Sequence, residues 1–371
     1  MRASGLLRAP PRWPGVIALA LAAAVLAAAV PARAAGDGAA HPLPSGAGAA
    51  GDASTPQSAA PDGADAKKRA FLASFRSSVV RVDSRAVDAA PSAASLGERR
   101  SGSGVILESQ LVLTIGYLLL ETESVDVTTA SGKRIPGSVA GYDHATGFGL
   151  VRTVLPLDGA RIELGDSDRV AERDKVLTIG QGEGEATEVY VLSRKPFAGS
   201  WEYLIERPIF TFPPVNNWSG SALIGQDGKL VGVGSLIVQD AAAERRRVPG
   251  NMFVPVNLLK PILEDLRTAG RRSGPVQPWL GMATEWIHGN LVVVRVSRDA
   301  PAEIAGIEPG DVVVAVDGER VTDQAGFYRR LWSLGPAGTE VTLRVLRAGS
   351  LREVRVHSID RMEALSKPRG V

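Results

Sequence analysis

Short runs of apolar residues, many alternating with polar positions, recur from Lys67 onward and are separated by turn residues. They include SGVILE, LVLTIGYLLL, SVDVTTA, GSVAGYD, FGLVRTV, KVLTIG, EVYVLS and PIFTF. Ser131-Gly132 and Asp227-Gly228 lie between alternating runs, as expected of hairpin turns. Strand after short strand without intervening helices predicts an all-β sandwich or a pair of β-barrels.

A helical pattern closes this set of predicted strands. Within MFVPVNLLKPILEDLRTAG, five apolar positions follow helical spacing, namely Leu258, Leu259, Ile262, Leu263 and Leu266. Gly270 follows directly and is placed to cap the helix at its C-terminal end. The pattern therefore predicts a helix that ends the larger unit.

A smaller unit of about 80 residues follows the linker RRSGPVQP. It contains the strand pattern NLVVVRV, the helical pattern DQAGFYRRLWSLG and the strand patterns EVTLRVLR and LREVRVHSI. We therefore expect a larger domain over residues 67–268, a linker over 269–277, a second domain over 278–360 and a tail over 361–371.

The N-terminal segment has the pattern of an export signal. Arginines precede the apolar run GVIALALAAAVLAAAV, and the small residues of PARA follow it. We expect a cleaved signal peptide over residues 1–34, with a retained membrane anchor as the alternative. Residues 35–66 are rich in Ala, Gly, Pro and Ser, which predicts a disordered spacer. An exported chain without cysteine, and so without disulfides, suggests a bacterial periplasm.

Composition and charge exclude several function classes. The chain of 371 residues is 44% hydrophobic and 22% charged, with a net charge of +2, so it gives no argument for nucleic acid as a partner. Arg245-Arg246-Arg247 is interpreted as a solvated loop. The sequence has no HExxH, no cysteine pair and no clustered carboxylates, and we expect neither a metal nor a cofactor.

Several motifs in order and spacing resemble one family. AGIEPGDVVVAVDGERVTD is similar to the PDZ domain of HtrA (DegP-like) proteases, and the larger unit resembles their trypsin-like domain. The motifs of the larger unit are GSGVILESQLVLT, ASGKRIPGSVAGYD, LGDSDRVAERDKVLTIG, SGSALIGQDGKLVGV and FVPVNLLKPILEDLRTAG. The resemblance implies an all-β, trypsin-like double β-barrel followed by a PDZ domain, which is a small α+β barrel.

The resemblance also implies a Ser-His-Asp triad in the cleft between the barrels, and here the sequence departs from the family. The family's histidine position falls on Tyr117 in VLTIGYLLLE, and its aspartate position falls on Gly147 in DHATGFGLV. Ser219 in NWSGSA takes the nucleophile position of GNSGGP. A tyrosine with an ordinary pKa of about 10 is a poor proton acceptor at neutral pH. Ser219 is therefore predicted to be a remnant nucleophile.

The oxyanion loop departs from the family pattern as well. Asn217 replaces the glycine whose N–H helps to build the oxyanion hole, and we expect asparagine to adopt that glycine's backbone poorly. Trp218 places a bulky ring beside Ser219. Of the four histidines, only His144 lies in the protease-like domain. We interpret His144 as an exposed turn residue, with a role as a rescuing base as the alternative.

The second domain retains the features that peptide binding needs. WLGM, which is Trp279, Leu280, Gly281 and Met282, resembles the HtrA-type loop that holds a peptide's C-terminal carboxylate on backbone N–H groups. Gly281 permits close backbone approach, while Leu280 and Met282 are expected to line the side-chain pocket. The alternative is a PDZ unit whose groove is filled by its own chain.

Two functions compete on this sequence. One is a non-catalytic, HtrA-like periplasmic scaffold, adaptor or chaperone in protein quality control, whose partners are unfolded proteins or protein C-termini. The other is an active periplasmic serine endopeptidase with Ser219 as nucleophile and an unconventional base. Tyr117 and Gly147 favour the first. A membrane-tethered assembly factor is a third interpretation if the signal is retained.

The family resemblance also implies an assembly. HtrA proteins use aromatic residues near the start of the protease domain to form trimers, and Phe71 and Phe75 lie in about that place. We therefore expect a homo-oligomer, with a trimer as the implied form. A mixed assembly with a catalytically intact HtrA relative is a further hypothesis.

Overall fold

The computed structural model describes residues 75–181, 186–243 and 247–366. The predicted signal peptide, the predicted spacer and Phe71 lie outside the described residues. In the part of the chain that is described, no helix has the length and apolarity needed to cross a membrane.

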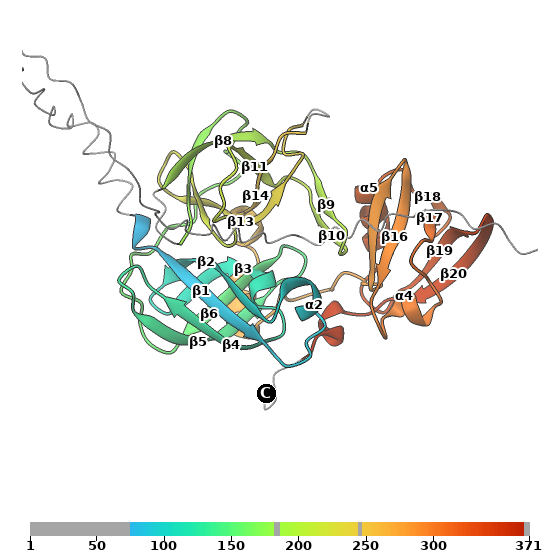
Figure 1. The fold of residues 1–371 in the computed structure, drawn as a ribbon, viewed down its shortest axis with the longest axis horizontal. Helices are drawn as coiled ribbons and strands as arrows, with labels where there is room; N and C mark the ends of the chain where they lie inside the picture. Colours follow the sequence, from blue (N-terminus) through green and yellow to red (C-terminus); the bar gives the residue numbers. More distant parts are fainter. Residues whose placement is uncertain (1–74, 182–185, 244–246, 367–371) are drawn as a thin grey trace, which may run out of the picture. The chain divides into compact units, whose positions relative to one another are not determined.

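The first six strands form a closed barrel (Figure 1). Neighbouring strands are antiparallel in the order β1-β2-β3-β6-β5-β4. The strands are β1 (Val79–Ala86), β2 (Arg99–Glu108), β3 (Leu111–Ile115), β4 (Thr122–Thr128), β5 (Arg134–Tyr142) and β6 (Phe148–Thr153). A short helix α2 (Ala93–Leu96) and a 3₁₀ turn η1 (Gly116–Leu118) interrupt them. Inward apolar side chains such as those of Val80 and Val82 fill the barrel.

The next strands form a second closed barrel in the order β11-β14-β13-β12-β7-β8, again antiparallel throughout. Its strands are β7 (Lys175–Ile179), β8 (Thr187–Ser193), β11 (Ile209–Phe212), β12 (Ala222–Ile224), β13 (Leu230–Val238) and β14 (Gly250–Pro255). A separate hairpin, β9 (Phe197–Gly199) and β10 (Tyr203–Ile205), leaves the barrel between β8 and β11. The two barrels confirm the predicted all-β, trypsin-like fold.

The predicted hairpin turns are present in both barrels. Gly132 lies between β4 and β5 with a φ of 88°, and Gly228 lies between β12 and β13 with a φ of 75°. Only glycine adopts such backbone angles without strain, so these two residues set where the strands reverse.

The helix predicted at the end of the larger unit is split. A 3₁₀ turn η2 (Val256–Leu258) comes first, and helix α3 (Leu263–Ala269) follows it. Pro261 lies between them, and a proline inside a helix removes a backbone hydrogen bond and clashes with the preceding turn. Gly270 ends α3 in the left-handed conformation with a φ of 75°, which confirms the predicted C-cap.

The second unit is a sheet with two helices, in the strand order β15-β16-β17-β19-β20, with β18 paired to β17. Its elements are β15 (Met282–Ile287), β16 (Asn290–Val296), α4 (Pro301–Ile304), β17 (Val312–Val316), β18 (Glu319–Arg320), α5 (Gln324–Ser333), β19 (Glu340–Arg347) and β20 (Ser350–His357). Asp323 caps α5 by accepting the N–H of Gly326.

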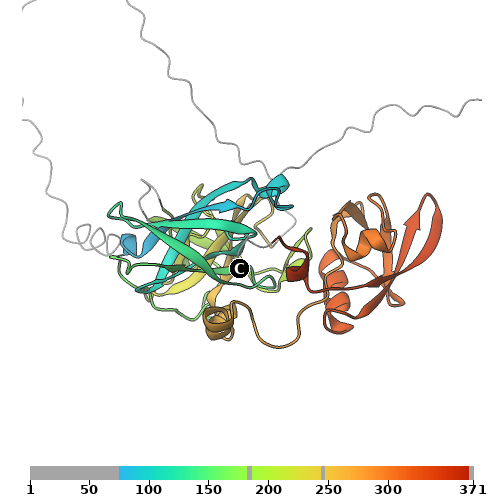
Figure 2. The same ribbon diagram turned by 90° about the horizontal axis from the view of Figure 1, so that it is seen from below.

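After β20 the chain returns to the first barrel (Figure 2). A 3₁₀ turn η3 (Arg361–Ala364) follows the sheet, and the N–H of Ser366 donates to the carboxylate of Glu121 at 2.8 Å. The first part of the predicted tail is therefore ordered against the barrel.

Candidate functional site

Ser219 lies in the loop between β11 and β12, and β2 of the other barrel holds this loop. The N–H of Ser103 donates to the carbonyl of Ser219 at 2.7 Å. Gly220 has a φ of 71°, and a Cβ there would lie 1.9 Å from the carbonyl oxygen of Ser103. The close approach of the serine loop to β2 therefore requires glycine beside the serine.

Tyr117, which the sequence predicted at the family's histidine position, contacts this serine directly. Its phenol oxygen lies 2.8 Å from Oγ of Ser219 and 3.0 Å from the carbonyl oxygen of Ser235. A phenol has a single proton, so it can donate to only one of the two oxygens at a time. When the phenol donates its hydrogen bond to the carbonyl of Ser235, the hydroxyl of Ser219 can donate one to the phenol oxygen. In both arrangements the phenol oxygen stays in hydrogen-bond contact with Oγ of Ser219.

The backbone around Tyr117 is fixed by a buried arginine. Arg100 is only 6% exposed, and its guanidinium donates to the carbonyls of Tyr117 at 3.1 Å and Leu120 at 2.6 Å. Hydrogen bonds from a charged donor are among the stronger ones in proteins. The phenol is therefore presented to Ser219 by an anchored segment.

The phenol cannot serve as a base at neutral pH. Burial raises the pKa of Tyr117 to about 12, and the hydrogen bond with Ser219 acts against this rise. With a pKa about five units above neutrality, only roughly one phenol in 10⁵ is ionised. Tyr117 therefore contacts the serine hydroxyl as a neutral phenol.

Gly147, which the sequence predicted at the family's aspartate position, ends the turn before β6. Its φ is 79°, and its carbonyl accepts the N–H of Gly116 at 2.6 Å. A Cβ at this position would lie 3.2 Å from the phenol oxygen of Tyr203, and that phenol donates to the carbonyl of Thr146 at 2.8 Å. The space beside Gly147 is therefore partly filled by a buried tyrosine from β10.

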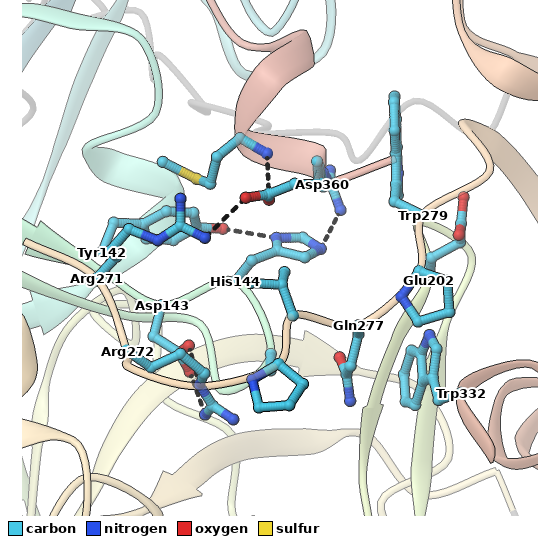
Figure 3. Close-up of a pocket in the computed structure, with 16 residues that line it drawn as sticks. Tyr142, Asp143, His144, Glu202, Arg271, Arg272, Gln277, Trp279, Trp332 and Asp360 are labelled. Atoms are coloured by element: carbon cyan, nitrogen blue, oxygen red, sulfur yellow. Dashed lines mark hydrogen bonds and ion pairs between the residues drawn. The ribbon is translucent and has the colours of Figure 1, made fainter. Parts of the chain in front are cut away.

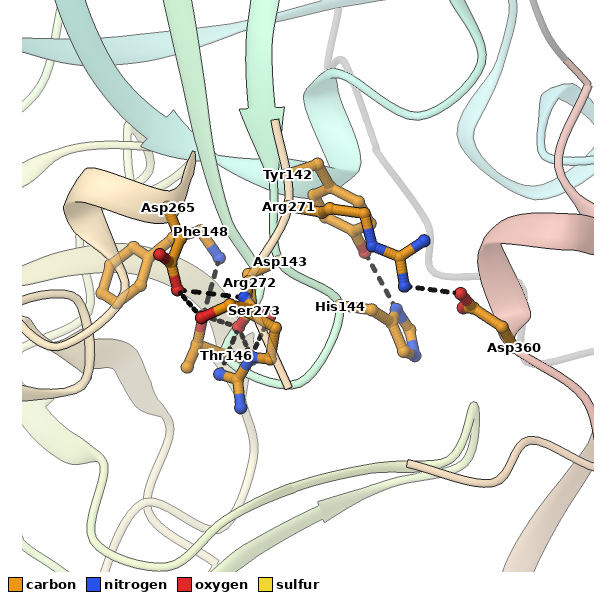
Figure 4. Close-up of polar contacts among 10 residues, drawn as sticks. All are labelled: Tyr142, Asp143, His144, Thr146, Phe148, Asp265, Arg271, Arg272, Ser273 and Asp360. Atoms are coloured by element: carbon orange, nitrogen blue, oxygen red, sulfur yellow. Dashed lines mark hydrogen bonds and ion pairs between the residues drawn. The ribbon is translucent and has the colours of Figure 1, made fainter. Parts of the chain in front are cut away.

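The acidic residue in this turn, Asp143, forms an ion pair with an arginine. Asp143 is buried, and Arg272 donates to its two carboxylate oxygens at 2.6 and 2.9 Å (Figure 4). The backbone N–H of Thr146 donates to the same carboxylate at 2.8 Å. Asp143 thus fixes the turn and ties it to the segment after α3.

Asn217 is exposed at the rim of the serine loop. It does not have a positive φ, so it does not adopt a left-handed backbone. A Cβ on Gly180 would lie 2.5 Å from the carbonyl oxygen of Asn217, so the two loops approach closely here. Trp218 is half-buried beside Ser219, and its carbonyl accepts the N–H of Ser221 at 3.0 Å.

His144 is not the exposed turn residue that we expected. It is half-buried, and its Nδ1 lies 3.0 Å from the hydroxyl of Tyr142 (Figures 3 and 4). Its Nε2 contacts the guanidinium of Arg361. Burial and then the positive charge of Arg361 hold the pKa of His144 well below its usual value. The imidazole is therefore neutral, and both ring nitrogens have partners in this network.

A small cavity of about 50 Å³ lies beside this network (Figure 3). The residues around it include Tyr142, Asp143, His144, Glu202, Trp279 and Arg361. A cavity of this size has room for water.

The four predicted peptide-binding residues lie together at the start of β15. Trp279 forms a backbone bridge with Ile359, and Leu280 and Met282 are buried in the core of the second unit. Gly281 has a φ of 81°, and a Cβ there would lie 2.3 Å from Cβ of Ala300. Glycine is therefore required at the centre of this loop.

An acidic side chain of the same chain occupies this loop. The carboxylate of Glu202, from the turn between β9 and β10, accepts the backbone N–H groups of Leu280, Gly281 and Met282 at 2.9, 2.8 and 3.1 Å. Burial raises the pKa of Glu202 to about 7, while these hydrogen bonds and the charge of Arg361 act against the rise.

Sequence reasoning missed three residues of this region, namely Glu202, Tyr203 and Arg361. The only local signal is an acidic residue between aromatic ones in GSWEY. The partners of Glu202 lie about 80 residues further along the chain, beyond the range of any periodic pattern.

Comparisons with protein families agree with this architecture. The profile of the trypsin-like peptidase domain matches residues 102–233, and the profile of the PDZ domain matches residues 278–357. The chain therefore combines a trypsin-like peptidase fold with a PDZ domain.

Similar proteins carry HtrA-type names. A probable periplasmic serine protease of the do/HhoA-like type from Haemophilus influenzae is 27% identical over 274 residues, covering 70% of this chain and 58% of that protein. The periplasmic serine endoprotease DegP of Salmonella typhimurium is 24% identical over 266 residues, covering 67% of this chain and 54% of DegP. The chain thus spans little more than half the length of these relatives. Their names support the HtrA resemblance expected from the sequence.

A solved structure gives the same fold. A variant of the HtrA-type protease AlgW with a tripeptide aligns with a TM-score of 0.50 at 20% identity, covering 80% of this chain and 97% of that one. At this identity the likeness concerns the fold.

Proposed function

We propose that this chain is an exported, HtrA-like protein without peptidase activity, which binds peptides and unfolded proteins as a scaffold, adaptor or chaperone in protein quality control. The observation that carries the proposal is the phenol of Tyr117, 2.8 Å from Oγ of Ser219, at the position where a general base would have to act. In this proposal Ser219 is a remnant nucleophile, and the PDZ domain recognises protein C-termini.

The chemistry supports the absence of turnover. Attack on a peptide carbonyl requires a group that takes the proton of Ser219, and a phenol with a pKa of about 12 does not do so at neutral pH. Gly147 brings no carboxylate to orient a base. Loss of triad members lowers turnover on the order of 10⁴–10⁶-fold. What remains is a two-barrel scaffold with a peptide-recognition domain attached to it.

The proposed compartment is the periplasm. The relatives from Haemophilus influenzae and Salmonella typhimurium are named as periplasmic, and residues 1–34 have the pattern of an export signal. The proposed partners are unfolded proteins, protein C-termini and a catalytically intact HtrA relative. A homo-oligomer, in the first place a trimer, is part of the proposal, and detection of monomer alone at micromolar concentration would contradict it.

The first test is chemical labelling. The mature protein and its Ser219→Ala variant are treated with a fluorophosphonate probe, with trypsin as the positive control, and both are assayed for casein cleavage. We expect neither labelling nor cleavage above the level of Ser219→Ala. Labelling of the natural chain alone would mean that Ser219 is activated, and the endopeptidase interpretation would return.

The second test concerns binding. Unfolded casein is titrated onto the fluorescently labelled full chain, and the aggregation of a heat-denatured client protein is followed with and without the chain. We expect saturable binding and slower aggregation, both unchanged in Ser219→Ala. A chain that neither binds casein nor slows aggregation would not be a chaperone of this kind.

A further inference from the structure

The β9–β10 hairpin packs on the PDZ domain. Leu204 of β10 is 9% exposed and belongs to the same apolar cluster as Leu280, Met282 and Tyr328 of the PDZ domain. Ala198 of β9 packs against that cluster as well. Helix α5 contacts both strands, and Figure 1 shows the hairpin beside this helix. The hairpin, which precedes the PDZ domain in the sequence, thus contributes side chains to the core of that domain.

The turn of the hairpin lies between β15 and α5. The N–H of Thr284 on β15 donates to the carbonyl of Ser200 at 2.9 Å, as a strand does to a neighbouring extended segment. From α5, the hydroxyl of Tyr328 donates to the carbonyl of Gly199 at 2.7 Å. A peptide added to the edge of β15 would need the same N–H group and the same space.

The side chain of Glu202 completes this occupation. Its carboxylate accepts three successive backbone N–H groups, at Leu280, Gly281 and Met282, in the manner of a peptide's terminal carboxylate. Glu202 is 4% exposed and has a φ of 58°, which residues other than glycine seldom adopt. The backbone is therefore held in an unusual conformation that directs this side chain into the loop.

A second contact holds the same turn from the other side. Arg361, from η3, donates to the carbonyl of Trp201 at 2.9 Å and lies over the ring of Trp279, 5.7 Å from its centroid. The turn thus lies between β15, α5 and the segment that follows the PDZ domain.

We propose that the hairpin turn Gly199–Glu202 is an internal ligand of the PDZ domain, with the Glu202 carboxylate in the place of a C-terminus, so that a peptide binds only by displacing the hairpin. This inference rests on the proposed peptide recognition and concerns its regulation. A tethered ligand competes at a high effective concentration, so the apparent affinity for a peptide falls with the fraction of open groove. The domain would therefore select strongly binding or locally concentrated C-termini.

The experiment uses the full chain and two readouts. Hydrogen exchange of the amides of Leu280, Gly281 and Met282 is measured in the natural chain, in Glu202→Gln and in Glu202→Ala. A pool of fluorescent octapeptides with an apolar C-terminal residue is titrated onto the same proteins, with the amidated pool as the control for the terminal carboxylate. The matched control variant is Glu353→Ala, an exposed glutamate on β20. Circular dichroism verifies that each variant is folded.

We expect both Glu202 variants to exchange these three amides at least 10-fold faster and to bind the free-carboxyl pool at least 10-fold more tightly, while Glu353→Ala matches the natural chain. Unchanged exchange in both Glu202 variants overturns the inference, and so does equal peptide affinity when the peptide binds. Faster exchange without peptide binding in any protein upholds the internal ligand and refutes the proposed recognition of C-termini. The two hypotheses therefore fail separately.

Discussion

At the scale of single residues, the site shows a serine whose loop and hydroxyl are held by their neighbours. Ser219 retains its loop, the glycine after it and the backbone bond from the opposite barrel. Tyr117 is hydrogen-bonded to it at 2.8 Å, so the distance between the two side chains suits proton transfer. The protonation state does not suit it, because burial raises the pKa of Tyr117 to about 12 and the phenol therefore already carries its proton at neutral pH. We therefore expect the contact to contribute to stability.

The Tyr117→Phe variant tests this distinction. It removes the phenol oxygen that contacts Ser219 and Ser235, so we expect the free energy of unfolding in urea to fall by about 0.5–1.5 kcal/mol. We expect no gain in fluorophosphonate labelling. Tyr190→Phe is the control, because Tyr190 is an exposed tyrosine of the second barrel. A rise in labelling in Tyr117→Phe would show that another group activates Ser219 once the phenol is gone.

At the scale of secondary-structure elements, the helix that ends the larger unit shows where a periodic pattern succeeds and where it fails. The pattern predicted α3 and its cap at Gly270, because both depend on local sequence. It treated Leu258 as part of the same helix, but Pro261 divides the segment. Leu258 is 37% exposed, while Leu266 is fully buried and α3 packs on β5.

Truncation of these two leucines separates the two environments. We expect Leu266→Ala to lower the free energy of unfolding by about 2–5 kcal/mol, because it leaves a cavity in a closed core. Leu258→Ala on the exposed turn is the matched control and should cost less than about 1 kcal/mol. Thermal and urea unfolding followed by circular dichroism measure both. Equal losses would mean that α3 is not packed as described.

At the scale of the whole molecule, the imidazole of His144 joins a turn of the first barrel to the segment after the PDZ domain. Its partners are Tyr142 on one side and Arg361 on the other, and Arg361 also holds the turn that carries Glu202. A proton on Nε2 would put a second positive charge against the guanidinium. The contact therefore requires a neutral ring.

The pH dependence follows from this requirement. The folded pKa of His144 is depressed below its unfolded value of 6.5, so below about pH 6.5 the unfolded chain binds more protons and stability falls. Relative to His144→Gln, we expect the natural chain to lose up to about 1.4 kcal/mol per pH unit between pH 6.5 and 5. Urea unfolding of both proteins across this range measures the difference. The raised pKa of Glu202 changes stability with pH in the opposite direction, but both proteins contain Glu202, so its contribution cancels in the comparison. Parallel stability curves for the two proteins would refute a lowered pKa of His144.

The sequence predicts the fold far better than it predicts the connections around the site. Alternating strands, hairpin glycines and the α3 cap are local features, so an all-β larger unit follows from them. The choice of two barrels and a PDZ domain rested on the family resemblance. Tyr117, Gly147 and Ser219 could be singled out because motifs fix their places. The partners of His144 and Glu202 lie far away in sequence, and nothing near Glu202 indicates that its carboxylate reaches Gly281. The sequence left open the alternative of a PDZ groove filled by the protein's own chain, but it did not indicate which segment would fill the groove.

The tyrosine beside Gly147 has an evolutionary consequence. Histidine at position 117 alone would be an imidazole without an orienting carboxylate, so turnover would stay low. Restoring aspartate at Gly147 requires a side chain at a φ of 79° whose Cβ approaches the Tyr203 hydroxyl to 3.2 Å. A side chain at Gly147 therefore requires the Tyr203 hydroxyl to yield by a few tenths of an ångström. Under the proposed function, a return to hydrolysis would need changes at Tyr117 and Gly147 together, because neither change alone supplies both an imidazole and the carboxylate that orients it.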